Sequence, residues 1–145
     1  MQKSYHYFML MNHTLFQKQA FEQLADTPLS IGQPKVLDFL YEHDGCMQKE
    51  IAEGCLLEPA SVTSLLSRME REELIRRTAK DGDRRSLYVF LTPYGKEMAE
   101  RVRHAMHEIE SRALSGFRPD EQDVLMQFLE KIHSNLCTQP NDNFS

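Results

Sequence analysis

The stretch that decides the fold runs from Gln48 to Met98 and reads QKEIAEGCLLEPASVTSLLSRMEREELIRRTAKDGDRRSLYVFLTPYGKEM. It predicts a short helix over 48–54, the turn GCLLEP, and a second helix that begins at about Pro59. In that second helix the apolar residues Val62, Leu65, Leu66 and Met69 recur at the spacing of one buried helix face. Two helices joined by a short turn have the layout of a helix-turn-helix.

Two β-like runs follow, LIRRTAK and RSLYVFLT, and they meet around Asp81-Gly82-Asp83. An Asp-Gly pair between such runs is a strong hairpin signal. Alternating Leu87, Val89 and Leu91 predict a half-buried strand. A helix-turn-helix followed at once by a basic hairpin is the layout of a winged helix-turn-helix, whose second helix enters the major groove of DNA.

Outside this stretch, apolar spacing predicts further helices over about 5–24, 33–43, 93–114 and 119–136. The expected fold class is therefore mainly α with a small β-hairpin wing, and it has about six helices. We expect one domain over 1–137, with a DNA-binding core at about 33–92, and a disordered tail over 138–145. The last helix is expected to bury Val124, Leu125, Phe128, Leu129, Ile132 and Leu136.

The net charge of −5 opposes a nucleic-acid interpretation, because Lys and Arg drive phosphate binding. The charge is unevenly spread: 1–47 carry 3 basic and 5 acidic residues, 48–103 carry 11 and 10, and 104–145 carry 3 and 7. Residues 74–86 hold 5 basic and 2 acidic residues, a local charge of +3. Local potential decides where an anion docks, so the hairpin remains a candidate DNA-binding element.

The exposed face of the second helix has the chemistry of a recognition helix. Small residues allow close approach, hydroxyls donate or accept hydrogen bonds, and Arg68 is able to pair with a guanine edge. On the hairpin, Arg84 and Arg85 are expected to enter a narrow minor groove. We assign Lys49, Arg76, Arg77 and Lys80 to phosphates. The candidate recognition-helix residues are Pro59, Ala60, Ser61, Thr63, Ser64, Ser67, Arg68 and Arg71.

These motifs resemble the DNA-binding core of the MarR family of bacterial transcription factors, with D-x-R as Asp83-Arg84-Arg85 and L-T as Leu91-Thr92. The resemblance implies a triangular homodimer, held by the first, fifth and sixth helices, on a pseudo-palindromic operator. It also implies that Asp83 braces the wing and that Arg85 or its neighbour Arg84 enters the minor groove. Members usually carry Gly where this chain has Glu73, and we expect that Glu to extend the preceding helix slightly.

The resemblance further implies a repressor that a small aromatic or phenolic effector releases from its operator. Such effectors bind in a cleft between the dimerisation helices and the winged domain. His13, Phe16 and Phe39 are the candidate lining residues. Release requires the ligand to favour the spacing of recognition helices that does not bind DNA.

Three alternatives stay open, and one class is excluded. Cys46 and Cys55 suggest a thiol switch, whereas His104 and His107, or the cluster Glu42, His43 and Cys46, suggest metal sensing. A winged helix that binds only proteins is the third alternative. The chain has no Gly-rich phosphate loop, zinc-pair motif or nucleophile elbow, so we expect no enzyme, cofactor or metal. Without an apolar run of bilayer length or a signal peptide, we expect a cytoplasmic protein with no membrane partner.

Overall fold

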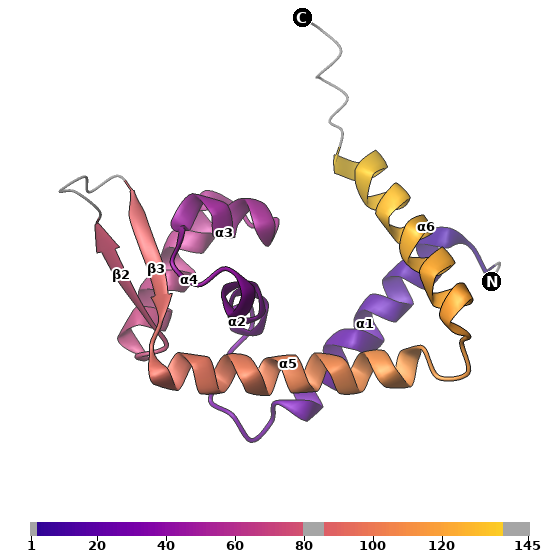
Figure 1. Ribbon diagram of the computed structural model, residues 1–145, viewed down its shortest axis with the longest axis horizontal. Helices are drawn as coiled ribbons and strands as arrows, with labels where there is room; N and C mark the ends of the chain where they lie inside the picture. The colour runs from indigo at the N-terminus through magenta and orange to yellow at the C-terminus, as the bar shows by residue number, and fades with distance from the viewer. Residues whose placement is uncertain (1–2, 80–85, 138–145) are drawn as a thin grey trace, which may run out of the picture. The chain divides into compact units, whose positions relative to one another are not determined.

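The computed structural model describes residues 3–79 and 86–137. Within these ranges the helices and strands follow one another in the order of a winged helix (Figure 1). The fold is mainly α with a small antiparallel sheet, as the sequence predicts. None of the described helices is both long and apolar enough to cross a membrane. The elements are α1 (Tyr5–Gln23), α2 (Gln33–Glu42), β1 (Cys46–Met47), α3 (Gln48–Gly54), α4 (Pro59–Arg71), β2 (Ile75–Ala79), β3 (Leu87–Leu91), α5 (Pro93–Ala113) and α6 (Pro119–Cys137).

The sheet has the order β1-β3-β2, and β3 pairs antiparallel with both neighbours. Ile75 lies opposite Leu91 and Ala79 opposite Leu87, so β2 and β3 form the predicted hairpin arms. Strand β1, in which Cys46 pairs with Val89, was not predicted from the sequence. A strand of two residues is too short to show an alternating pattern.

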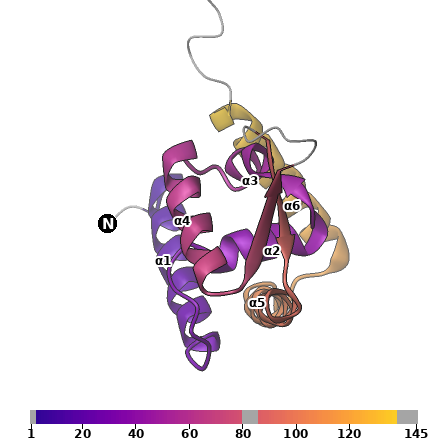
Figure 2. The same cartoon turned by 90° about the vertical axis from the view of Figure 1, so that its left-hand side faces the viewer.

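The chain divides into two compact units, residues 1–109 and 110–145. The first unit holds the buried core, to which α2, α3, α4, the sheet and α5 all contribute (Figure 2). On α4 the predicted apolar face is confirmed, because Val62, Leu66 and Met69 are buried. The largest fully buried side chains of this unit are Leu37, Leu40, Ile51, Leu66, Met69, Leu74 and Ile75.

The expectation that the last helix buries its apolar face is wrong for the single chain. No residue of α6 is buried, and Phe128 is 61% exposed. The physical reason is that the described part of the second unit, residues 110–137, contains one complete helix, which has no second element there with which to build a core. Helix α1, in the first unit, also has no buried residue.

The junction between α4 and β2 corrects a second expectation. Glu73 does not extend α4: the helix ends at Arg71, Glu72 is its C-cap, and Glu73 has φ of +62°. This left-handed conformation costs an L-residue about 1–2 kcal/mol. The buried Thr92 holds the turn, because its Oγ1 donates to the Glu73 carbonyl at 2.6 Å and accepts from the Gly95 amide at 2.9 Å.

Candidate nucleic-acid interface

Helix α4 presents one apolar and one polar face, and the core fixes which face is outward. Pro59 occupies the first turn, where a missing backbone N–H costs nothing. The predicted recognition residues form a continuous solvent-facing surface of small, hydroxyl and cationic side chains. Of these, Ser67 is half-buried, and the exposed members are Pro59, Ala60, Ser61, Thr63, Ser64, Arg68 and Arg71.

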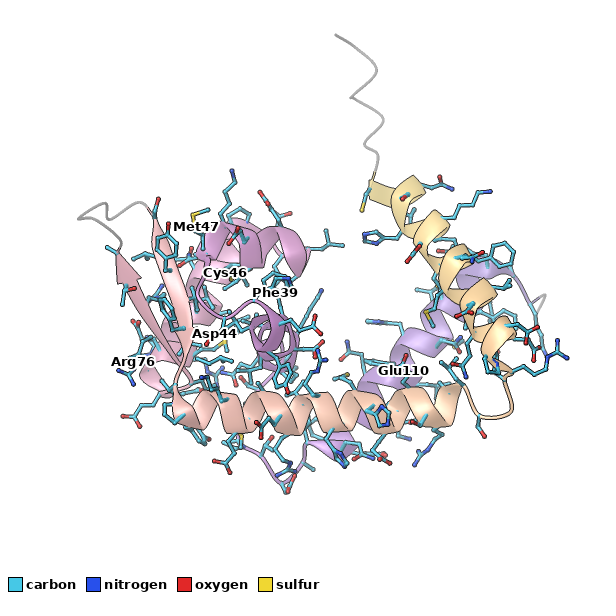
Figure 3. The ribbon with its side chains drawn as sticks, in the orientation of Figure 1. Phe39, Asp44, Cys46, Met47, Arg76 and Glu110 are labelled. Atoms are coloured by element: carbon cyan, nitrogen blue, oxygen red, sulfur yellow. The ribbon has the colours of Figure 1, made fainter. Side chains whose placement is uncertain are left out.

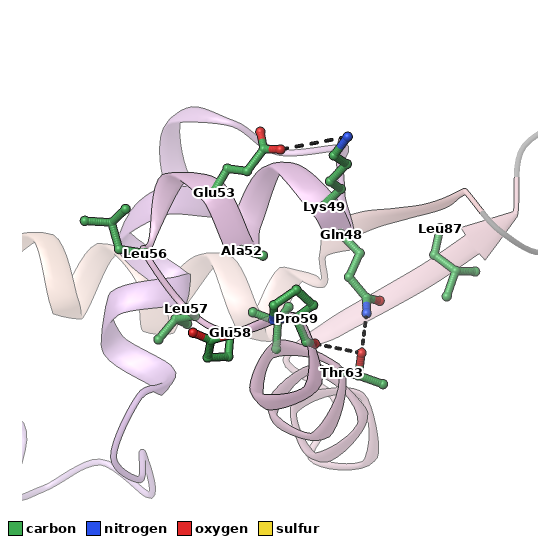
Figure 4. Close-up of a pocket in the computed structure, with 11 residues that line it drawn as sticks. Gln48, Lys49, Ala52, Glu53, Leu56, Leu57, Glu58, Pro59, Thr63 and Leu87 are labelled. Carbon is green, nitrogen blue, oxygen red and sulfur yellow. Dashed lines mark hydrogen bonds and ion pairs between the residues drawn. The ribbon is translucent and has the colours of Figure 1, made fainter. Parts of the chain in front are cut away.

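The hydroxyl of Thr63 already makes two internal hydrogen bonds. Its Oγ1 donates to the Pro59 carbonyl at 3.0 Å and accepts from Gln48 Nε2 at 3.0 Å (Figure 4). A hydroxyl has one hydrogen and two lone pairs, so one lone pair remains. In this arrangement Thr63 is able to accept a further hydrogen bond from a base but not to donate one.

Arg68 is held by a chain of polar contacts that begins in the core. Its Nε donates to Glu72 Oε1 at 2.9 Å, and Glu72 Oε2 accepts from Gln33 Nε2 at 2.7 Å. Gln33 is fully buried, and its Oε1 accepts from the Ser30 amide at 2.9 Å. The hydrogen bonds from Gln33 and then Arg68 lower the pKa of the Glu72 carboxyl. Arg68 is thereby oriented through Nε, which leaves its terminal nitrogens available for a guanine edge.

Gln33 and Glu72 were not predicted as site residues from the sequence. Both look like ordinary helix residues, because Gln is common in helices and Glu72 pairs with Arg68 at the usual i, i+4 spacing. The one sequence feature that could have indicated a buried polar contact was Gln33 itself, a polar residue at the start of a helix whose apolar positions are Val36, Leu37 and Leu40.

The two arginines of β2 lie in different environments. The side chain of Arg76 is exposed, makes no hydrogen bond or ion pair among the described residues, and points away from the body of the fold (Figure 3). The side chain of Arg77 is only 15% exposed and contacts Glu70, Ser67 and Gln48. Only Arg76 therefore has the free, exposed guanidinium that a phosphate contact needs. Lys80, Asp83, Arg84 and Arg85, the other wing candidates, lie outside the described residues.

Lys49 lies on the exposed surface of α3, where its Nζ is 3.9 Å from Glu53 Oε1. It borders a cavity of about 610 Å³ between α3 and the start of α4, and Leu87 of β3 also lines this cavity (Figure 4). An exposed pair at this distance contributes little to stability. Lys49 is thus able to exchange Glu53 for a phosphate at small cost.

The structure does not bring the three effector candidates together in one cavity. Phe39 stacks on His43 with ring centroids 4.3 Å apart and lines a cavity of about 280 Å³. The other lining residues come from α2, the end of α3 and α5, and neither His13 nor Phe16 is among them. Both of those residues are exposed on α1.

The cysteines and histidines that the sequence suggested for sensing, Cys46, Cys55, His104 and His107, do not have the environment of a sensor site. Burial raises the pKa of the Cys46 thiol to about 11 and also raises that of Cys55, which opposes formation of a reactive thiolate. His104 and His107 are both exposed. Within residues 3–79 and 86–137, no three His, Cys, Asp or Glu side chains are grouped so as to hold a metal ion.

Together, the helix pair α3–α4 and the adjoining hairpin define a winged helix-turn-helix. A sequence model of the MarR family matches residues 29–87, which run from the connection before α2 to the first residue of β3. The chain is also 33% identical over 132 residues to the HTH-type transcriptional repressor MdtR of Bacillus subtilis, covering 89% of this chain and 85% of that protein. This chain belongs to the MarR family, whose members are transcriptional regulators and not enzymes.

Two further proteins are similar to this chain. The uncharacterized HTH-type transcriptional regulator YkoM of B. subtilis is 35% identical over 102 residues, which cover 68% of this chain and 66% of YkoM. The crystal structure of the S. aureus MepR-DNA complex matches with a TM-score of 0.81 and 28% identity, covering 93% of this chain and 99% of MepR. The family resemblance found from the sequence is therefore confirmed.

Proposed function

We propose that this protein is a sequence-specific DNA-binding repressor that acts as a homodimer in the bacterial cytoplasm. The observation that carries the proposal is the outward face of α4, which is small, polar and cationic, next to the exposed Arg76 of the wing. The similarity to MepR, which was crystallised with DNA, supports the DNA-binding part. The similarity to MdtR, a named repressor, supports the direction of regulation.

In this proposal, contacts to DNA divide into two kinds. The recognition residues of α4 read base edges in the major groove. Lys49, Arg76 and Lys80 neutralise phosphates, and Arg85 or Arg84 enters the minor groove while Asp83 braces the wing. We reassign Arg77, because its guanidinium is already engaged inside the fold.

Uncovered apolar surface supports the homodimer. Neither α1 nor α6 has a buried residue in the single chain. Exposed apolar patches of this extent usually mark a protein interface, and most oligomers are symmetric homodimers. We therefore treat 1–137 as one functional domain that is completed by a second copy. The exposed apolar residues are Tyr5, Phe8, Met9, Leu10, Met11, Leu15, Phe16 and Phe21 of α1, with Val124, Met126, Phe128, Leu129 and Leu136 of α6.

We propose that a small aromatic or phenolic effector releases the operator. The continuous helix α5 supports this part, because it begins at the wing and contributes Val102 and Ala105 to the core before it leaves the first unit. A ligand that favoured one position of α5 would change the spacing of the recognition helices. If a saturating ligand leaves operator affinity unchanged, that ligand is not the effector.

The decisive experiment is a salt titration of binding to a duplex that carries the protein's own upstream region, beside a scrambled duplex. We expect a steep fall of affinity with salt and a preference of at least about 10³ for the specific duplex. A confirmed dimer that binds neither duplex would leave either an operator outside this region or a winged helix that binds only proteins.

A further inference from the structure

Arg77 lies at the point where α3, α4 and β2 meet. Its Nη2 lies 3.3 Å from Glu70 Oε1 and 3.2 Å from Ser67 Oγ, both on α4. Its Nη1 lies 3.5 Å from Oε1 of Gln48, the first residue of α3. One guanidinium therefore contacts both helices of the helix-turn-helix from the wing.

Glu70 binds Arg77 through both carboxylate oxygens. While Oε1 accepts from the guanidinium, Oε2 accepts from the Arg77 backbone amide at 2.9 Å. The strand β2 is at the edge of the described sheet, so this amide has no strand partner on that side. The carboxylate thus fixes the backbone of β2, and not only a side chain, against α4.

The partners of Arg77 also touch the recognition face. Ser67 belongs to that face, and Gln48 donates through Nε2 to Thr63 of the same face. The Nε of Arg77 is buried and has no partner among the described residues, so the guanidinium is held through Nη1 and Nη2.

We infer that Arg77 and Glu70 are positioning residues for DNA recognition: they fix the angle between the recognition helix α4 and the wing without touching DNA. This inference rests on the proposed DNA binding. Specific binding requires α4 and the wing to reach the major groove and the adjacent minor groove at the same time. Loss of the contact leaves both elements present but no longer held at that angle.

The test uses the full chain and the salt titration described above, with Arg77→Gln, Arg77→Lys and Glu70→Gln. We expect each variant to bind the specific duplex about tenfold more weakly, with an unchanged salt slope, because no phosphate contact is lost. Arg77→Lys is not expected to restore the affinity for the specific duplex, since an ammonium cannot bridge Glu70, Ser67 and Gln48 as the planar guanidinium does. The double variant that combines Glu70→Gln with Arg77→Gln should bind the specific duplex no more weakly than either single variant, because both changes remove the same contact.

Arg76→Gln is the matched control, because it removes an arginine from the neighbouring position of the same strand. It should lower the salt slope by about one, as expected for a lost phosphate contact. If Arg77 instead binds phosphate, Arg77→Gln would lower the salt slope by about one, and Glu70→Gln would bind more tightly because a competing anion is gone. Either result would overturn the inference.

Failure of a variant to fold is distinguishable from failure of the proposal. If Arg77→Gln does not fold, the affinities of Glu70→Gln and Arg77→Lys for the specific duplex decide, because the positioning role requires both to bind more weakly than the wild type. If the wild-type chain itself shows no salt-dependent preference for the specific duplex, the proposed function fails and the inference fails with it. Tighter binding by Glu70→Gln beside a normal wild type would overturn the positioning role alone.

Discussion

The winged-helix core and the terminal helices α1 and α6 both carry large apolar side chains but differ in burial. Leu37, Leu66 and Met69 of the core are fully buried within one chain. By contrast, Phe8 and Phe128 of the terminal helices remain exposed. Both regions contain side chains large enough to build a core. Only the winged-helix core encloses them within a single chain.

The difference separates two kinds of stability. Contacts inside the core depend on one chain, so their contribution to the free energy of unfolding is independent of protein concentration. A surface that needs a second copy contributes more as concentration rises, through mass action. The concentration dependence of each variant below therefore tests which region it belongs to.

The largest effect is expected for Gly95→Ala, at the start of α5. A Cβ on Gly95 would overlap the Leu74 carbonyl oxygen, which is rigid backbone at the α4–β2 junction. We expect a loss of about 3 kcal/mol in the free energy of unfolding, at the upper end for overpacking. Thermal or urea unfolding at two protein concentrations should give the same loss at both.

Gly116→Ala is the matched control for that change. Gly116 has φ of +83°, but a Cβ at this position would meet no described residue within 4 Å other than its two chain neighbours. Only backbone strain is expected, with a loss of about 1 kcal/mol. Equal losses at the two glycines would contradict the role assigned to the Leu74 carbonyl.

A second, somewhat smaller effect is expected for Phe128→Glu in α6. The change places a charge on the surface proposed to meet the second copy, so we expect the dimer dissociation constant to rise about 100-fold. Sedimentation velocity over a range of concentrations measures this. Ile31→Glu is the control, because Ile31 is 97% exposed but lies outside α1 and α6. Weakened association in the control alone would place the interface elsewhere.

Much of the fold could be predicted from the sequence, because its signals are local. The buried face of α4 is predicted by the spacing of Val62, Leu66 and Met69. The strand β3 is predicted by the alternation of Leu87, Val89 and Leu91. What could not be predicted depended on partners distant in sequence. Glu73 takes a conformation typical of Gly because Thr92, 19 residues away, holds its carbonyl.

The candidate site also has one part that could be predicted from local sequence and one part that depends on the three-dimensional fold. The outward residues of α4 follow from its periodicity, and their exposure agrees with the prediction. Arg76 and Arg77 are adjacent and chemically identical, so composition assigns both to phosphate. Only the three-dimensional fold distinguishes them, because it turns Arg77 toward Glu70 and Arg76 toward solvent. Their roles remain predictions until DNA binding is measured.

A smaller effect, of opposite sign, is expected for Glu73→Gly. Glycine adopts the φ of +62° without strain, although it also loses more conformational entropy on folding. The net result should be a gain of roughly 0.5–1 kcal/mol that does not vary with protein concentration. Arg71→Gly, two residues earlier at the end of α4, should instead cost about 1 kcal/mol. Thermal unfolding compares the two, and a loss of stability at both positions would contradict the strain assigned to Glu73.

The smallest effect concerns the acid sensitivity of the core and depends on Glu72. Hydrogen bonds from Gln33 and Arg68 lower its pKa from the ordinary value of 4.5. The ionised carboxylate therefore stabilises the folded chain above pH 4.5, and this contribution is lost as the pH falls through the lowered pKa. Because the side chain is 37% exposed, solvent screening limits the effect to about 0.5 kcal/mol.

Urea unfolding of the wild type and of Glu72→Gln, at neutral pH and again below pH 4, measures this contribution as a difference between the two proteins. The stability gap should narrow on acidification, since the wild-type carboxyl becomes protonated and the amide does not change. Glu100→Gln, an exposed position on α5, controls for the general effect of removing one negative charge. A gap that narrows only at high protein concentration would assign the acid sensitivity to the association surface and not to Glu72, because the contacts of Glu72 lie within a single chain.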